Sequence, residues 1–256
     1  MTLDAALIFA FFLVFVRCSA MFLSAPFFGG SNVPRLIRIL AAVLVAAALT
    51  STVRHALPRP PADMYSFVAL VANEILAGLL IGVFIQIVIL AAEMGGSFMD
   101  LQVGLSMSHV LNPTNGQSST VLSEFKSMLA LIVFLAVNGH HVVLGAFVKS
   151  FDIMPVVTGG TLAAVEQNQV ALVANLSLIA LQISTPVLAV AILVDAALGI
   201  MNKAVPQMQI FIVGMPAKVA MGLMAVSVGL PATAAAVLGG IEYATDTLYK
   251  VMSARG

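Results

Sequence analysis

Residues 65–94 read YSFVALVANEILAGLLIGVFIQIVILAAEM, and Glu74 and Glu93 are the only charged side chains in the stretch. About 20 apolar residues are enough for an α-helix to cross the hydrocarbon core of a bilayer. Gly78 and Gly82 form a GxxxG motif, a spacing of small residues that lets two helices approach closely. The motif is also common by chance in apolar sequence. The stretch therefore predicts a long membrane helix, with a helix contact as one interpretation of its glycines.

The rest of the chain repeats this pattern. The protein has 256 residues, of which 61% are hydrophobic and 9% charged, and its mean hydropathy is +1.10. A soluble domain carries roughly a quarter charged residues, so this chain is too apolar for a single soluble core. We expect an all-α, membrane-associated bundle of long kinked helices and helical hairpins. Besides Tyr65–Met94, the expected helices are Leu3–Phe28, Leu36–Val53, Ser127–Lys149, Val170–Met201 and Ile210–Ile241.

Breakers interrupt the expected helices and separate them. Pro186 lies inside the fifth segment, and Pro216 and Pro231 lie inside the sixth. Proline removes a backbone donor and kinks a helix, and in lipid the freed carbonyls need neighbouring groups. We therefore expect bent helices or tight hairpins packed on protein. Turn-rich stretches predict loops at residues 29–34, at 55–61, at Pro155 with Gly159-Gly160, and at Pro206.

Composition and motifs exclude several classes of function. Eleven basic residues balance eleven acidic ones, so no basic face indicates nucleic acid as a partner. The single cysteine, Cys18, excludes an internal disulfide and is expected to be a small packing residue. His140 and His141 are adjacent, whereas helical metal pairs are spaced i, i+4, so a helix-end role is favoured over metal binding. HExxH, nucleophile-elbow and P-loop motifs are all absent. We expect no catalysis and no cofactor.

The stretch from Glu93 to Phe125 differs most from the rest of the chain. It begins with small and Gly-rich sequence and continues through Asn112-Pro113 and Asn115-Gly116, which are typical of turns. A loop this long in a compact helical protein is functional or disordered. One interpretation is a solvent-exposed connector. The other is a neutral, deformable segment that lines or closes a water-filled path.

Ionisable residues within apolar segments are costly and raise a functional hypothesis. Arg17 follows a 12-residue apolar run, and a structural ion pair with a carboxylate on another helix is its alternative interpretation. A direct proton relay from Glu74 to Glu93 is disfavoured, because 19 residues of straight helix span about 28 Å. The candidate intramembrane charges are Arg17, Glu74, Glu93, Asp100, Asp195, Lys203 and Lys218.

Several stretches occur together in a characteristic order and spacing. They are RCSAM at 17–21 through APFFG at 25–29 to Val33-Pro34; AEM at 92–94 through GLS at 104–106; Asn112-Pro113; Asn138-Gly139-His140; and AVPQMQIF at 204–211 with GMPAK at 214–218. These motifs resemble the FliR family of flagellar export-gate proteins and its counterparts in virulence-type secretion systems. The last is the most specific, because polar and proline positions interrupt a helix.

The resemblance implies a core component of the flagellar type III export gate in the bacterial inner membrane, within the flagellar basal body. The implied partners are FliP-like, FliQ-like and FlhB-like subunits, an FlhA-like export component, membrane lipid and unfolded flagellar proteins in transit. It further implies that about residues 1–200 form a FliP-like part and about 201–256 a FliQ-like hairpin. Such a protein contributes to a conduit and does not itself pump.

The resemblance also implies that the loop after Gly-Leu-Ser is a plug, which maps to about residues 106–123. Relatives often have an aromatic residue near its start, where this chain has Met107 and Val110, so an aromatic gate is not expected. The candidate pore and plug residues are Gly104, Leu105, Ser106, Met107, Ser108, His109, Val110, Leu111, Asn112, Pro113, Thr114, Asn115 and Gly116.

Two other functions remain open on the sequence. A secondary transporter or ion channel would use Glu74, Glu93 and Asp195 at broken helices. It predicts an inverted repeat, and the halves of the chain show no convincing self-similarity. The second alternative is the equivalent subunit of a virulence-type secretion system.

Overall fold

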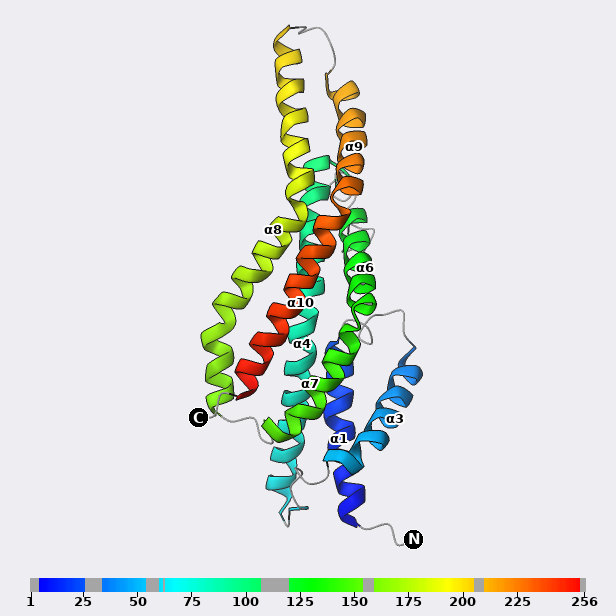
Figure 1. The fold of residues 1–256 in the computed structure, drawn as a ribbon, viewed down its shortest axis with the longest axis vertical. Coiled ribbons are helices and arrows are strands. Elements are labelled where there is room, and N and C mark those ends of the chain that lie inside the picture. The colour runs from blue at the N-terminus through cyan, green and yellow to red at the C-terminus, as the bar shows by residue number, and fades with distance from the viewer. Residues whose placement is uncertain are drawn as a thin grey trace. The chain divides into compact units, whose positions relative to one another are not determined.

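The computed structural model describes residues 5–25, 34–53, 60–61, 63–106, 120–153, 159–204 and 210–253. In these ranges every regular element is an α-helix (Figure 1), which confirms the predicted fold class. The helices are α1 (Ala5–Ser24), α3 (Arg35–Val53), α4 (Met64–Val103), α6 (Val121–Ala136), α7 (Gly139–Ile153), α8 (Gly159–Ala204), α9 (Ile210–Val228) and α10 (Leu230–Ser253).

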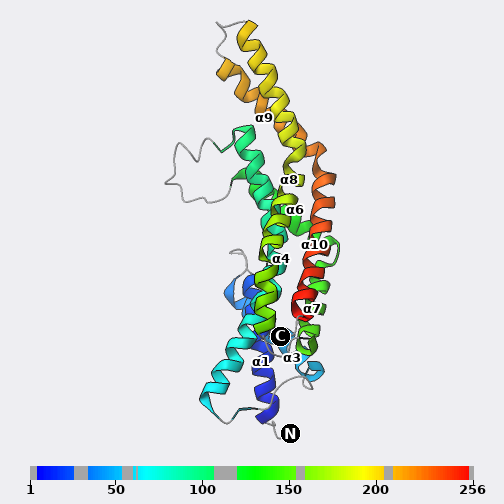
Figure 2. The ribbon, with the colours of Figure 1, turned by 90° about the vertical axis from the view of Figure 1, so that its left-hand side faces the viewer.

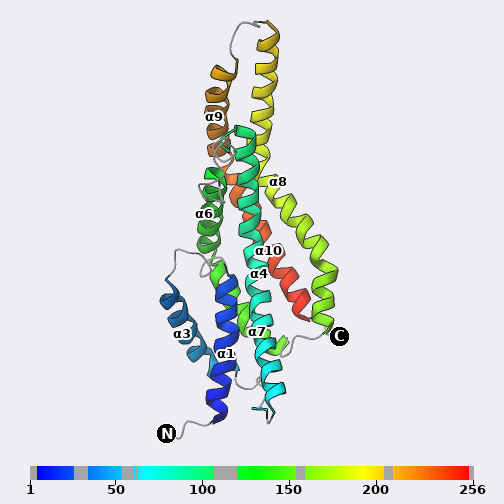
Figure 3. The same cartoon turned by 180° about the vertical axis from the view of Figure 1, so that it is seen from behind.

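The chain forms two compact units. The first comprises residues 1–87, 135–172 and 241–256, and the second comprises 88–134 and 173–240. In the first unit α1 and α3 lie side by side (Figures 1 and 3). In the second unit α9 runs beside the C-terminal part of α8 (Figures 2 and 3).

Helix α4 is longer than the sequence predicted. It continues beyond Met94 to Val103, so the Gly-rich beginning of the expected loop is helical. The reason is packing: a Cβ at Gly95 would lie 2.8 Å from the carbonyl oxygen of Ala180, and one at Gly96 would collide with Leu122. Glycine disfavours helix by about 1 kcal/mol. Here its small size lets α4 contact α8 and α6, and this contact outweighs that preference.

Two predicted boundaries also shift at glycine and proline. Gly159-Gly160 was expected to be a loop but forms the start of α8, which continues through Pro186 to Ala204. The sixth predicted segment is two helices, α9 and α10, bent by 55° at Gly229. Pro231 is the second residue of α10, a position where its missing N–H costs no hydrogen bond. The ring of Pro186 packs where a Cβ of Gly229 would be.

The fourth predicted segment is divided as well. Helices α6 and α7 are separated at Asn138, whose φ of 56° is a left-handed conformation that asparagine tolerates. His140 and His141, for which a helix-end role was favoured, lie in the first turn of α7 with ring centroids 4.3 Å apart.

Membrane-type helices account for most of the described chain. Four helices are long and apolar enough to cross a membrane, and up to six spans result if the pairs α6–α7 and α9–α10 each count as one. Much of this apolar surface is exposed in the chain alone; Leu44 of α3, for example, is 70% exposed. The buried core of the first unit includes Leu13, Ile81 and Phe147, and Cys18 is a buried free thiol, as predicted.

Candidate functional site

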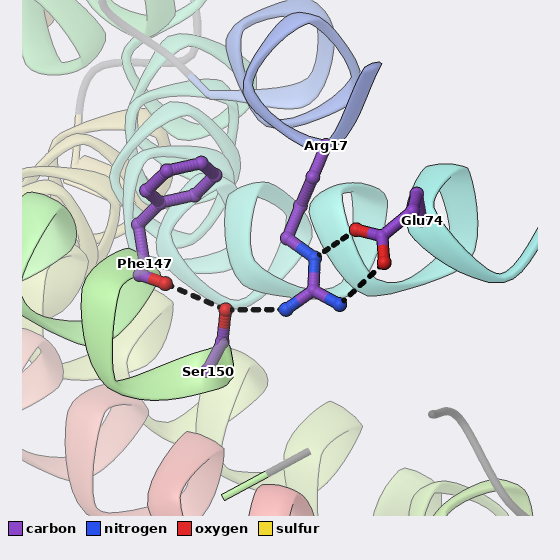
Figure 4. Close-up of polar contacts among 4 residues, drawn as sticks. All are labelled: Arg17, Glu74, Phe147 and Ser150. Atoms are coloured by element: carbon purple, nitrogen blue, oxygen red, sulfur yellow. Dashed lines mark hydrogen bonds and ion pairs between the residues drawn. The ribbon is translucent and has the colours of Figure 1, made fainter. Parts of the chain in front are cut away.

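The charged side chains on α1 and the first half of α4 form one buried centre in the first unit (Figure 4). Arg17 Nε donates to Glu74 Oε2 at 2.5 Å, and Nη2 donates to Glu74 Oε1 at 3.1 Å. Nη1 donates to Ser150 Oγ of α7 at 2.9 Å, and this hydroxyl donates to the carbonyl of Phe147 at 2.6 Å. The ion-pair interpretation of Arg17 is confirmed.

The Arg17 centre is fully buried. The side chains of Arg17 and Glu74 are 0% and 1% exposed, and the guanidinium carbon lies 4.1 Å from the centre of the Phe151 ring. The planar guanidinium matches a carboxylate in a two-pronged arrangement, which adds both geometric specificity and strength. The arrangement joins α1, α4 and α7, and both carboxylate oxygens of Glu74 accept hydrogen bonds from Arg17.

Glycines on α4 make this centre possible. A Cβ at Gly78 would collide with the carbonyl oxygen of Arg17, and one at Gly82 would collide with Ser24 Oγ and lie 2.8 Å from the Met21 oxygen. The predicted GxxxG contact is therefore present, and its partner helix is α1. The close approach brings Arg17 within reach of Glu74, one turn before Gly78.

The second buried centre lies at the other end of α4, in the second unit. Asp100 is 0% exposed, and its Oδ2 accepts from the backbone N–H of Leu122 at 2.8 Å and of Ser123 at 3.1 Å. Its carbonyl oxygen accepts from the N–H of Gly104 at 3.0 Å and of Ser106 at 3.5 Å. Asp100 thus contacts the chain on both sides of residues 107–119.

The described residues include only part of the candidate plug. Gly104 has a φ of 93°, which favours glycine, and Ser106 is buried with its hydroxyl 3.5 Å from the Asp100 carbonyl. The predicted positions Met107–Gly116 lie outside the described residues. Asp100 was predicted as an intramembrane charge, but its role as a cap of α6 was not.

Lys126 is a buried cation that sequence reasoning missed. It is 0% exposed; its Nζ donates to Thr233 Oγ1 at 2.8 Å, and Thr233 Oγ1 donates to the carbonyl of Gly229 at 3.1 Å. The missed signal was a lone lysine one residue before an expected apolar helix. Ser150, the third member of the Arg17 centre, carried no signal of its own.

The remaining predicted charges do not belong to these buried centres. Asp195 of α8 bonds to Lys218 Nζ of α9 at 2.8 Å and accepts from Gln102 Nε2 at 3.2 Å. Glu93 is half-buried on α4 and Lys203 is exposed in the last turn of α8. Of the carboxylates named for an ion transporter, Glu74 is paired with Arg17 and Asp195 with Lys218.

Comparison with known proteins assigns the family. Residues 8–243 match the sequence model of bacterial export proteins, family 1. The chain belongs to this family. It is 36% identical over 221 residues to the flagellar biosynthetic protein FliR of Bacillus subtilis (strain 168), covering 84% of this chain and 83% of that protein.

Other relatives agree with this assignment to export protein family 1. The FliR protein of Caulobacter vibrioides is 30% identical over 218 residues, covering 85% of this chain and 87% of its own length. That of Escherichia coli (strain K12) is 28% identical over 227 residues, covering 86% and 84%. The predicted resemblance to the FliR family is confirmed, and the matched range includes both buried centres.

Proposed function

We propose that this chain is a membrane-embedded component of the flagellar export apparatus, and that it forms part of the type III gate through which unfolded flagellar proteins leave the cytoplasm. Family membership over residues 8–243 carries the proposal. Four to six apolar helices support a location in the bacterial inner membrane. The large exposed apolar surface, exemplified by Leu44, suits burial against other gate subunits and lipid.

We further propose that about residues 106–123 act as the plug of this gate. The segment is uncharged and flanked by glycine at its start. A neutral plug excludes ions without fixed charge that would favour some passing polypeptides over others. The contacts of Asp100 with Ser106 and Leu122 support the proposal, because they hold both ends of the segment at the end of α4.

The buried charges have a structural role in this proposal. Both carboxylate oxygens of Glu74 accept from Arg17, so the two buried charges compensate each other. In this proposal the protein is a conduit component and not an enzyme or a pump, and it needs no cofactor. FliP-like, FliQ-like, FlhB-like and FlhA-like proteins would be its partners, with residues 1–200 FliP-like and 201–256 a FliQ-like hairpin.

Removing the segment tests the plug. In cells with an assembled gate, deletion of Met107–Thr120 should increase ion leakage across the inner membrane. The control is replacement of the same residues, 107–120, by a Gly/Ser linker of equal length, which should leak less than the deletion. Unchanged conductance with both variants would overturn the plug.

Cross-linking and motility test the conduit. Single cysteines along Gln102–Glu124, in a Cys18→Ser background, should cross-link to a stalled export substrate. Cysteine at Leu44, which is exposed on α3, is the control that should not. Loss of motility on gene deletion is expected for a flagellar gate. Unimpaired motility with lost secretion of another protein set would assign the chain to a virulence-type system.

A further inference from the structure

The N-terminus of α6 is capped by a residue from another helix. Thr120 directly precedes α6, and its carbonyl accepts from the Glu124 N–H at 3.0 Å, so Thr120 occupies the N-cap position. A threonine there ordinarily accepts from the second or third amide of the helix with its own hydroxyl. These two amides, of Leu122 and Ser123, instead donate to Asp100 Oδ2.

The displaced cap is left without a partner. Thr120 Oγ1 is buried and has no hydrogen-bond partner in the part of the chain that the structure describes, although it belongs to the residue type and position that cap helices. We propose that Asp100 and Thr120 are alternative caps of α6, and that Asp100 is the positioning residue that joins the start of α6 to the end of α4. In the second state Thr120 caps α6 locally and Asp100 no longer holds it.

Thr120 can replace Asp100 as the acceptor of the first amides of α6, which lowers the free-energy cost of exchanging the two caps. Opening a helix end without replacement leaves unsatisfied backbone N–H groups, but here one acceptor replaces another. In the joined state Asp100 Oδ1 and Ser123 Oγ are also buried, and neither has a hydrogen-bond partner among the described residues. A buried polar group without a partner raises the free energy of the state that contains it. Release of Asp100 would expose these atoms to other donors and acceptors.

The inference rests on the proposed function where it concerns export. Ser106 and Thr120 are the described residues on either side of positions 107–119, and Asp100 accepts from the backbone of Ser106 and, two residues after Thr120, from that of Leu122. With Asp100 bound to Leu122, both sides of this segment are held at one place on α4. With Thr120 as the cap, α6 can move away from α4 without fraying, which is the change that a gate must make repeatedly.

Amide hydrogen exchange in the assembled, detergent-solubilised gate tests the exchange of caps directly. Thr120→Val alone should leave exchange at Leu122 and Ser123 unchanged, because Asp100 supplies the acceptor. Asp100→Ala should raise it modestly, because Thr120 takes over. In the double variant, exchange at Leu122 and Ser123 should be roughly fivefold faster than the product of the two single effects predicts. This is the factor expected from the loss of one helix cap.

Thr185→Val on α8 is the matched control, since the Thr185 hydroxyl bonds only within its own helix. It should change nothing at α6 in either background. If Asp100→Ala does not assemble, Asp100→Asn serves in its place, because it weakens the acceptor and keeps the shape. Equal effects of Thr120→Val with and without Asp100 would overturn the proposal.

Conductance separates this inference from the proposed function. Asp100→Ala should increase ion leakage through the gate, whereas Thr120→Val should reduce motility without leakage, because it removes the cap of the released state. Coupled hydrogen exchange with normal conductance and normal motility in both variants would support the two caps and overturn the plug. If the two substitutions affect amide hydrogen exchange independently of each other, the proposal of two alternative caps is overturned, whatever the conductance.

Discussion

The two buried centres neutralise charge in different ways. In the first unit Arg17 is matched by a carboxylate, Glu74, and completed by Ser150. In the second unit Asp100 is matched by backbone amides and Lys126 by a hydroxyl, so each is bound by neutral groups. All four charged side chains are at most 1% exposed. In the first centre both carboxylate oxygens of Glu74 accept hydrogen bonds. In the second unit Asp100 Oδ1 and Ser123 Oγ have no partner among the described residues.

This difference indicates different mechanical roles. Separating a buried ion pair leaves two charges without compensation, which is strongly unfavourable in an apolar environment. At the start of α6 the Thr120 hydroxyl can take the place of Asp100 as the acceptor of the amides, which lowers the cost of separating them. The Arg17 centre therefore fixes α1, α4 and α7 together, and the Asp100 centre is suited to rearrangement.

The largest effect is expected from breaking the Arg17 centre. Glu74→Gln should destabilise the protein by about 3–5 kcal/mol, because it leaves the buried guanidinium without a counter-charge. The combination Arg17→Met with Glu74→Leu should recover most of the loss. The measurements are the thermal unfolding midpoint in detergent and the amount of protein in the membrane. Glu166→Gln is the control, since Glu166 is an exposed carboxylate on α8; an equally mild effect at Glu74 would contradict the role of the pair.

Disrupting the close packing of α1 against α4, which buries the Arg17–Glu74 pair, should have a nearly equal effect on stability. Gly82→Ala should cost about 3 kcal/mol, the upper end of the usual range for overpacking, because the new methyl group meets the Met21 carbonyl oxygen and cannot displace backbone easily. Gly145→Ala is the matched control, because beyond its own stretch of helix no atom of the described residues lies within 4 Å of the added Cβ. Unfolding midpoints of the two variants should differ clearly, and equal midpoints would show that α1 and α4 do not pack closely.

The sequence predicted the first centre better than the second. Arg17 in an apolar run requires a counter-charge, and GxxxG indicates a helix contact, so both features follow from local chemistry. The cap formed by Asp100 depends on bringing positions 100 and 122 together, which no local pattern specifies. Gly95-Gly96 and Gly159-Gly160 were interpreted as loop sequence because glycine disfavours helix, whereas tertiary packing and position at a helix start decided otherwise. Lys126 was missed because its acceptor, Thr233, lies 107 residues away.

The Lys126 contact gives a smaller and asymmetric effect. Thr233→Val should cost about 2 kcal/mol, because it leaves a buried ammonium group without its acceptor. Lys126→Met should cost less, since it removes the charge and Thr233 keeps its bond to Gly229. Unfolding midpoints in detergent measure both. A greater loss for Lys126→Met than for Thr233→Val would contradict this account of the Lys126 contact.

The smallest effect is expected at Asp195 and Lys218, whose side chains are 46% and 17% exposed. Exposed ion pairs contribute at most about 1 kcal/mol, so Asp195→Asn should barely change the stability of the isolated chain. A double-mutant cycle with Lys218→Gln measures the coupling between the two side chains, and it can be repeated in the assembled gate. A partner subunit that covers the pair would exclude water and strengthen the coupling. Equal coupling in both preparations would show that this end of α8 and α9 remains hydrated after assembly, whereas stronger coupling in the gate would make Asp195 a third buried centre, created by its partners.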